Sequence, residues 1–174
     1  IGSDGQITVN QNNPTVTLGS NATFPAGHII QTQVGAISGT QVAVDDNSWD
    51  VNHVLNSVQI TPVKASSNIL LTSTNIWMSP HGSYIYADYY KNASDVTETA
   101  NLSGQSAGLG VVAGPSANTW GNGTYIFLDT CSENSLSQKT YKCSARMESG
   151  TGYIGWTTSS SGFYSIIIAQ EIAT

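Results

Sequence analysis

Frequent turn sequences divide this chain into short segments, and they limit the folds open to it more than any other feature. Stretches such as "SPHGS", "GPSANTWGNG", "ESGTG" and "TSSSG" are rich in Gly, Pro, Asn and Ser, which favour turns. The segments between them hold β-branched and aromatic residues, and no helical pattern is convincing. The chain is therefore predicted to be all-β. Strands at this spacing are typical of an antiparallel β-sandwich with jelly-roll-like connections.

The expected strands fall into two groups. Two brief ones, "QITV" and "TVTL", lie within residues 1–21 and are separated by Asn-rich turns. A hairpin this short is marginal alone in water. We therefore predict a shaft-like segment or linker over residues 1–23 and a β-sandwich domain over residues 24–174. The longer strands are expected near residues 28–34, 54–61, 68–78, 83–91, 106–113, 123–130, 138–147, 151–157 and 163–173.

Two of these strands are apolar on both faces. In residues 123–130, Tyr125 and Phe127 alternate with Ile126 and Leu128. A half-exposed strand shows one polar face, so either loops cover the outer face or that face is a subunit interface. We leave both interpretations open at this point. The last strand has the same character, with Tyr164, Ile166, Ile168 and Ile172 opposite Phe163, Ser165, Ile167, Ala169 and Glu171.

The charge content excludes some classes of partner. Only 9% of the residues are charged, the net charge is -6, and the five basic residues form no stripe. Nucleic-acid binding needs clustered Lys and Arg to neutralise phosphates, so we do not expect it. No run of 18 apolar residues occurs, and we expect no membrane insertion. The chain begins at Ile1 rather than Met, and we expect it to be a piece of a longer protein.

Several hydrophobic phrases, taken in order, resemble a known family. They are "FPAGHIIQTQ" (24–33), "VNHVLNSVQITPVKASSNILLTSTNIWM" (51–78), "YIFLDT" (125–130), "QKTYKCSAR" (138–146) and "IIIAQEIAT" (166–174). This series resembles the C-terminal domains of fibre proteins from tailed bacteriophages, notably phages of marine bacteria. The chain departs from the pattern at Cys131 and Cys143, and its aromatic stretch "SPHGSYIYADYYKNAS" is individual.

The resemblance implies a homotrimeric β-sandwich knob on a virion tail fibre or other external appendage, assembled in the bacterial cytoplasm. The N-terminal strands would then pack against the equivalent strands of the other two copies. Expected partners are the chain itself, other virion proteins on its N-terminal side, and a host-surface glycan or protein. The expected function is host attachment. The alternatives are a structural capsid fibre or decoration protein without a receptor and, less favoured, an enzyme that degrades surface polysaccharide.

Catalytic and metal-binding motifs are missing from the sequence. No G-x-S-x-G occurs, and His28, His53 and His81 lack metal-ligand spacing. The acids in "VDDN" (44–47) suggest a solvated turn more strongly than a calcium site. We therefore expect no enzyme activity, no metal and no cofactor.

Cys131 and Cys143 are expected in one hairpin, "FLDTCSENSLSQKTYKC". A turn centred near Ser135 would place Cys131 opposite Lys139 and Cys143 opposite Phe127. The two residues would be several positions out of register, too far apart for a disulfide. Assembly in a reducing cytosol would also keep the two thiols reduced. We expect no disulfide, although a bulged loop could bring the two together.

Aromatic residues near turns are the remaining functional signal. Sugar rings stack on aromatic faces, and aromatic residues dominate binding hot spots. Packing is the competing interpretation, and it is favoured for Tyr84, Tyr86 and Tyr90, which share one strand face. Candidate receptor contacts in or beside loops are Trp49, His81, Trp120, Tyr153 and Trp156.

Overall fold

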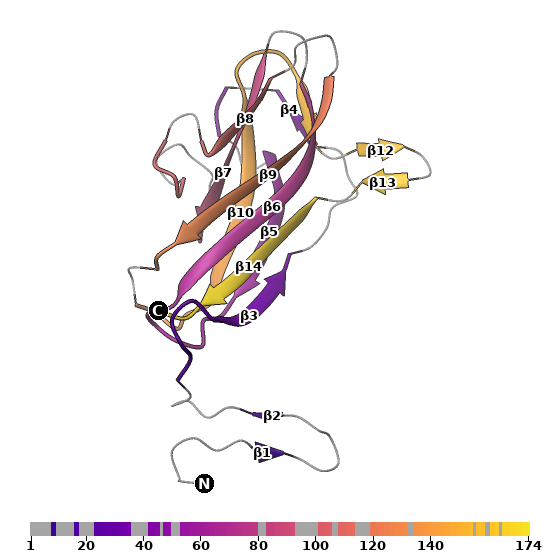
Figure 1. The fold of residues 1–174 in the computed structure, drawn as a ribbon. Helices are drawn as coiled ribbons and strands as arrows, with labels where there is room; N and C mark the ends of the chain where they lie inside the picture. The colour runs from indigo at the N-terminus through magenta and orange to yellow at the C-terminus, as the bar shows by residue number, and fades with distance from the viewer. Residues whose placement is uncertain are drawn as a thin grey trace.

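The computed structural model of the chain is all-β, as predicted (Figure 1). All pairings between the described strands are antiparallel, and the described part of the chain contains no α-helix. The structure describes residues 8–9, 16–17, 23–35, 42–45, 47–49, 53–79, 83–92, 101–105, 108–113, 119–131, 134–154, 156–158, 161–163 and 165–174.

The larger of two main sheets is built around one long strand. This strand, β6, pairs along its whole length with β9 and on its other side with β14 and then β11. Strand β3 pairs with β14, and β4 pairs with β11. The sheet consists of β3 (Ile29–Val34), β4 (Val42–Val44), β6 (Asn68–Ser79), β9 (Thr119–Asp129), β11 (Gly152–Ile154) and β14 (Ile166–Ile172).

The smaller sheet has four strands, in the order β5-β10-β7-β8. Two further pairs, β1-β2 and β12-β13, form separate two-stranded sheets, and Figure 1 shows both outside the two main sheets. The bounds are β5 (Val54–Ile60), β7 (Tyr84–Lys91), β8 (Gly110–Ala113), β10 (Lys139–Met147), β1 (Thr8–Val9), β2 (Val16–Thr17), β12 (Trp156–Thr158) and β13 (Ser161–Phe163).

The core lies between the inner faces of the two main sheets. Strand alternation produces it, because every second side chain of β6, β10, β7 and β14 points inward. The strand expected near 54–61 follows this alternation, with Val58 and Ile60 buried and Ser57 exposed. The largest buried apolar side chains are Trp77, Tyr89, Tyr141, Ile60, Ile69, Leu71, Ile85, Met147, Ile154 and Ile167.

Several strand boundaries differ from the prediction. Strand β9 begins at Thr119, so Trp120 lies in a strand rather than in a loop. Strand β4 was not expected. The segment expected as 163–173 begins at Ile166, and Phe163 belongs to β13 instead. Tyr164 lies outside the described residues.

The predicted β9–β10 hairpin is wrong. Strand β9 pairs with β6, whereas β10 lies between β5 and β7 in the other sheet. The segment after Asp129 therefore crosses from one sheet to the other. Cys131 and Cys143 are both buried free thiols in this structure. The hairpin register from which we argued against a disulfide does not exist.

Deleting residues 1–23 should leave the two main sheets folded. Among the described strands, β1 and β2 pair only with each other, and the longer strands begin at Ile29. We expect the truncated chain to show a cooperative thermal transition and an unchanged near-ultraviolet circular dichroism spectrum. Loss of the cooperative transition would mean that the N-terminal segment is part of the domain's own core.

Candidate functional site

The outer face of the larger sheet carries exposed apolar side chains. Val34, Ile168, Thr72 and Ile126 form one row across β3, β14, β6 and β9. The two ends of this row are 61% and 63% exposed. In the next row Leu128 is 45% exposed. Ile126, Leu128 and Ile168 belong to the two strands that the sequence showed to be apolar on both faces.

This face also lacks charge. Alternation along β3, β14, β6 and β9 assigns no charged residue to its described outward positions. An uncharged face loses little hydration energy when another surface covers it. Exposed apolar patches on a protein with few charges mark contact surfaces more often than ordinary solvent-facing ones.

The outer face of the smaller sheet is covered over part of its area. Trp49, from the segment after β4, packs edge-on against Tyr90 with ring centroids 5.8 Å apart. Trp49 is only 5% exposed, so its ring is not available to stack on a sugar. A residue from a loop therefore covers part of this sheet, but the strands for which the sequence left loop coverage open, β9 and β14, both lie in the larger sheet. The described residues leave the larger sheet uncovered.

The candidate receptor residues do not gather in one place. Tyr153 pairs with Met78, which pairs with Trp120, so these two candidates occupy one row across the end of the larger sheet. Tyr153 is half-buried. Trp156 lies in β12, in the hairpin beside the main sheets (Figure 1). His81 lies outside the described residues.

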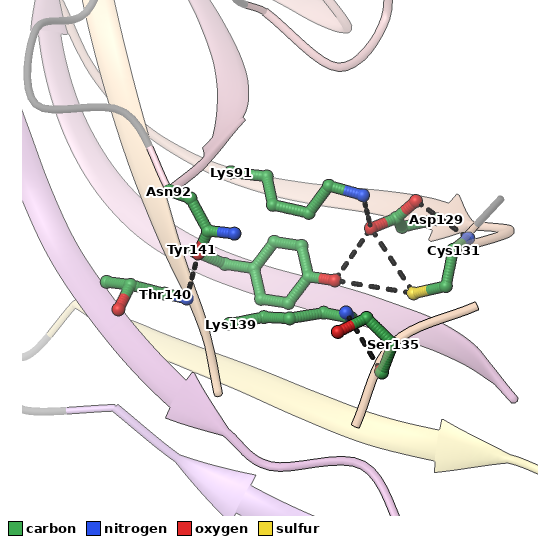
Figure 2. Close-up of polar contacts among 8 residues, drawn as sticks. All are labelled: Lys91, Asn92, Asp129, Cys131, Ser135, Lys139, Thr140 and Tyr141. Carbon is green, nitrogen blue, oxygen red and sulfur yellow. Dashed lines mark hydrogen bonds and ion pairs between the residues drawn. The ribbon is translucent and has the colours of Figure 1, made fainter. Parts of the chain in front are cut away.

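A buried polar cluster joins the two sheets at the end where β9 finishes. The Asp129 carboxylate accepts hydrogen bonds from the Tyr141 hydroxyl at 2.6 Å and the Cys131 backbone N–H at 3.0 Å, and it pairs with Lys91 Nζ at 2.8 Å. Figure 2 shows the Tyr141 ring between the side chains of Lys91 and Lys139, with its hydroxyl toward Asp129. Lys139 is buried, and its Nζ donates to the Ser135 carbonyl at 3.3 Å.

The electrostatics of this cluster favour a structural role. Burial alone would raise the pKa of Asp129, but hydrogen bonds from Lys91, Tyr141 and Cys131 hold the pKa below its usual value. Burial and the hydrogen bond to Asp129 raise the pKa of Tyr141, so its hydroxyl stays protonated and donates. Burial raises the pKa of the Cys143 thiol, in the core, to about 12. Such a thiol is neutral near pH 7 and is a poor nucleophile.

A second buried acid fastens the last strand. The Glu171 carboxylate accepts the backbone N–H groups of Val63 and Lys64, both at 2.9 Å, and the Gln31 side-chain amide at 2.7 Å. Burial opposes its charge, but these donors outweigh burial and lower the pKa of Glu171. The sequence analysis placed Glu171 on an apolar face and missed this role. One acid within an otherwise apolar strand was the available signal.

Two other acids lie apart from these clusters. Asp45 is exposed and lies 3.4 Å from His53 Nε2, while its neighbour Asp46 falls outside the described residues. Asp88 is buried, and desolvation raises its pKa although Tyr89, Asn101 and Ser103 donate to it. Within the described ranges, no three His, Cys, Asp or Glu side chains are grouped to hold a metal ion.

Comparison with known proteins gives no family assignment: no protein-family model matches the chain, and no curated protein matches it significantly. No helix in the described part of the chain is long and apolar enough to cross a membrane.

Replacing Glu171 should lower the free energy of unfolding and change how that free energy depends on pH. Because the pKa of Glu171 is lowered in the folded state, its contribution is full above its ordinary value of 4.5 and is lost as pH falls through the folded value. Glu171→Gln should lower the free energy of unfolding by about 2 kcal/mol at about pH 7. Urea titrations at several pH values should also show a shallower acid loss in this variant.

Glu148→Gln is the matched control, because Glu148 is exposed. It should unfold like the unmodified chain at each pH. Equal stability of Glu171→Gln and the unmodified chain near neutral pH would contradict the anchoring role of Glu171.

Proposed function

We propose that this chain is the globular knob of a homotrimeric fibre on a bacteriophage virion, of tail-fibre type, which attaches the particle to a glycan or protein on the host surface. The observation that carries the proposal is the exposed, uncharged outer face of β3, β14, β6 and β9. The phage assignment comes from the sequence resemblance.

Three copies arranged around one axis would cover this face on each copy. Closed symmetry is the usual solution for homo-oligomers, because it leaves no copy of the contact surface unpaired. The same axis would bring together the N-terminal segments, where β1 and β2 form a sheet too small to be stable alone. A shaft over residues 1–23 would then lead into the knob at residue 24.

Host contact in this proposal involves the end of the knob farthest from β1 and β2. Trp120 and Tyr153 share a row there, and His81 and Trp156 remain candidate contacts. Trp49 is left out because its ring is packed. Three linked copies of a weak site would bind with an avidity far above that of each site alone.

The assembly is tested by mass in solution. At micromolar concentration the chain should have three times the mass of 18.3 kDa. Ile126→Lys places a charge at the most exposed apolar position of this face, on β9, and should give a folded monomer. Val63→Lys is the matched control, since Val63 is similarly exposed but lies in the turn before β6.

Attachment is measured with the same proteins after fluorescent labelling, on a panel of marine bacterial strains. A strain that retains the trimer should retain the Ile126→Lys monomer about 100-fold less, because avidity is lost. Val63→Lys should behave like the unmodified trimer. A monomeric unmodified chain would contradict the assembly, and a trimer retained by none of the strains would favour a structural fibre without a receptor.

A further inference from the structure

Strands β3 and β9 lie at opposite edges of the larger sheet (Figure 1). Among the described strands, β3 pairs only with β14 and β9 pairs only with β6, so each has one side without a partner strand. Such a side presents backbone N–H and C=O groups that can pair with another strand. Strand β3 has six residues and β9 has eleven.

The strand register shows which backbone groups point away from the sheet. The Gly35 N–H donates to the Ile167 carbonyl at 2.7 Å, so Ile167 turns its backbone groups toward β3. Its partner Ser73 therefore turns toward β9, where it meets Tyr125. Successive residues of an antiparallel strand turn these groups to opposite sides. The outward N–H and C=O groups therefore belong to Thr32 and Val34 on β3 and to Thr124, Ile126 and Leu128 on β9.

Neither edge carries the features that usually prevent pairing between molecules. Edge strands are commonly short or bulged, or they carry Lys or Pro. Strand β9 contains no Lys or Pro and keeps a regular register with β6, and β3 has no charged residue. The charged residue of β9, Asp129, is its last residue and is paired with Lys91. In the described part of the chain, the five outward backbone positions form no hydrogen bond with another segment.

The two edges match each other in direction and in face. The order β3-β14-β6-β9 is antiparallel at every step, so β3 and β9 run in opposite directions. On both edges the outward backbone groups belong to residues whose side chains lie on the outer face, such as Val34 and Ile126. An odd number of strands would break both matches. The β9 edge of one copy therefore fits the β3 edge of a second copy as a regular antiparallel pair.

We propose that β9 of each copy pairs with β3 of the next, so that the larger sheets of the trimer join into one closed sheet. The proposal rests on the homotrimer proposed above and names the contact that holds it together. A ring of identical contacts between two different edges closes without leaving an edge open. It would bring Ile126 of one copy close to Val34 of the next, and these side chains are 63% and 61% exposed in the single chain.

The smaller sheet is less suited to such a ring. It also has four strands, but its edge strand β8 has only four residues. Its outer face carries Lys142 and Arg146, and Trp49 covers part of it. Turning this face toward a shared axis would take charged groups out of water, which costs free energy. The outer face of the larger sheet carries no charge at its described positions.

Amide hydrogen exchange, followed residue by residue by NMR on the deuterated full chain, tests the pairing. In the trimer, the amides of Thr32, Val34, Thr124 and Leu128 should exchange at least about tenfold more slowly than in the Ile126→Lys monomer. The Tyr125 amide points toward β6 and is the internal control, which should be protected in both proteins.

A backbone substitution gives a second test. Thr124→Pro removes an outward N–H from β9, and proline is tolerated on an edge strand where that group faces solvent. We expect a folded chain that needs about tenfold more protein to form the trimer. Thr124→Ala is the matched control, because it removes the same exposed hydroxyl but keeps the N–H group. It should assemble like the unmodified chain.

A trimer whose edge amides exchange as fast as in the monomer would overturn the pairing and leave the homotrimer standing. Edge amides that are already slow in the monomer would show that the chain covers its own edges, which would also overturn it. Protection of β9 without β3 would indicate pairing of β9 with β9 instead. A monomeric unmodified chain would remove the proposed assembly and this pairing together.

Discussion

The central position of β6 in the larger sheet is the constraint on which both faces of the molecule depend. Strands on both sides fix its register, so its odd-numbered residues from 69 to 77 point into the core and its even-numbered residues from 70 to 76 point outward. The inward set supplies Ile69, Leu71 and Trp77 to a closely packed interior. The outward set carries no charge. A single strand thus provides both the core and the middle of the proposed contact face.

The two main sheets are held together by buried acids as well as by apolar packing. Asp129 at the end of β9 contacts Tyr141 and Lys91 of the opposite sheet, and Glu171 on β14 contacts the turn at residues 63–64. Both carboxylates are met by donors, which is the condition under which a buried charge is tolerated. Charges are scarce in this chain, and these two are used for internal links rather than for the surface.

Local sequence patterns predicted much of the fold, whereas the features that depend on long-range contacts could not be predicted from them. Alternation divided the side chains of β14 correctly between two faces, because each residue's face depends only on its neighbours, but it did not show which of the two apolar faces is buried. Alternation could not predict that β9 pairs with β6, because β10 follows β9 directly in the sequence and a hairpin of the two was expected. "WGNG" was interpreted as a turn, but a Cβ at Gly123 would lie 2.7 Å from Trp77 Nε1. Glycine there makes room for core aromatic rings. Of the candidate contacts, the sequence could place neither Trp49 against Tyr90 nor Trp120 in a strand, because both placements depend on residues distant in the sequence.

The most direct test of the central claim measures whether the outer face of the larger sheet is covered in solution. Ile126→Cys and Val111→Cys place a thiol on the outer face of the larger and smaller sheet respectively, while the two native thiols are buried. The rate of reaction with a thiol reagent is followed as protein concentration rises. Coverage by other copies predicts that the rate at position 126 falls with concentration and that the rate at position 111 stays constant. Equal and concentration-independent rates at both positions would contradict it.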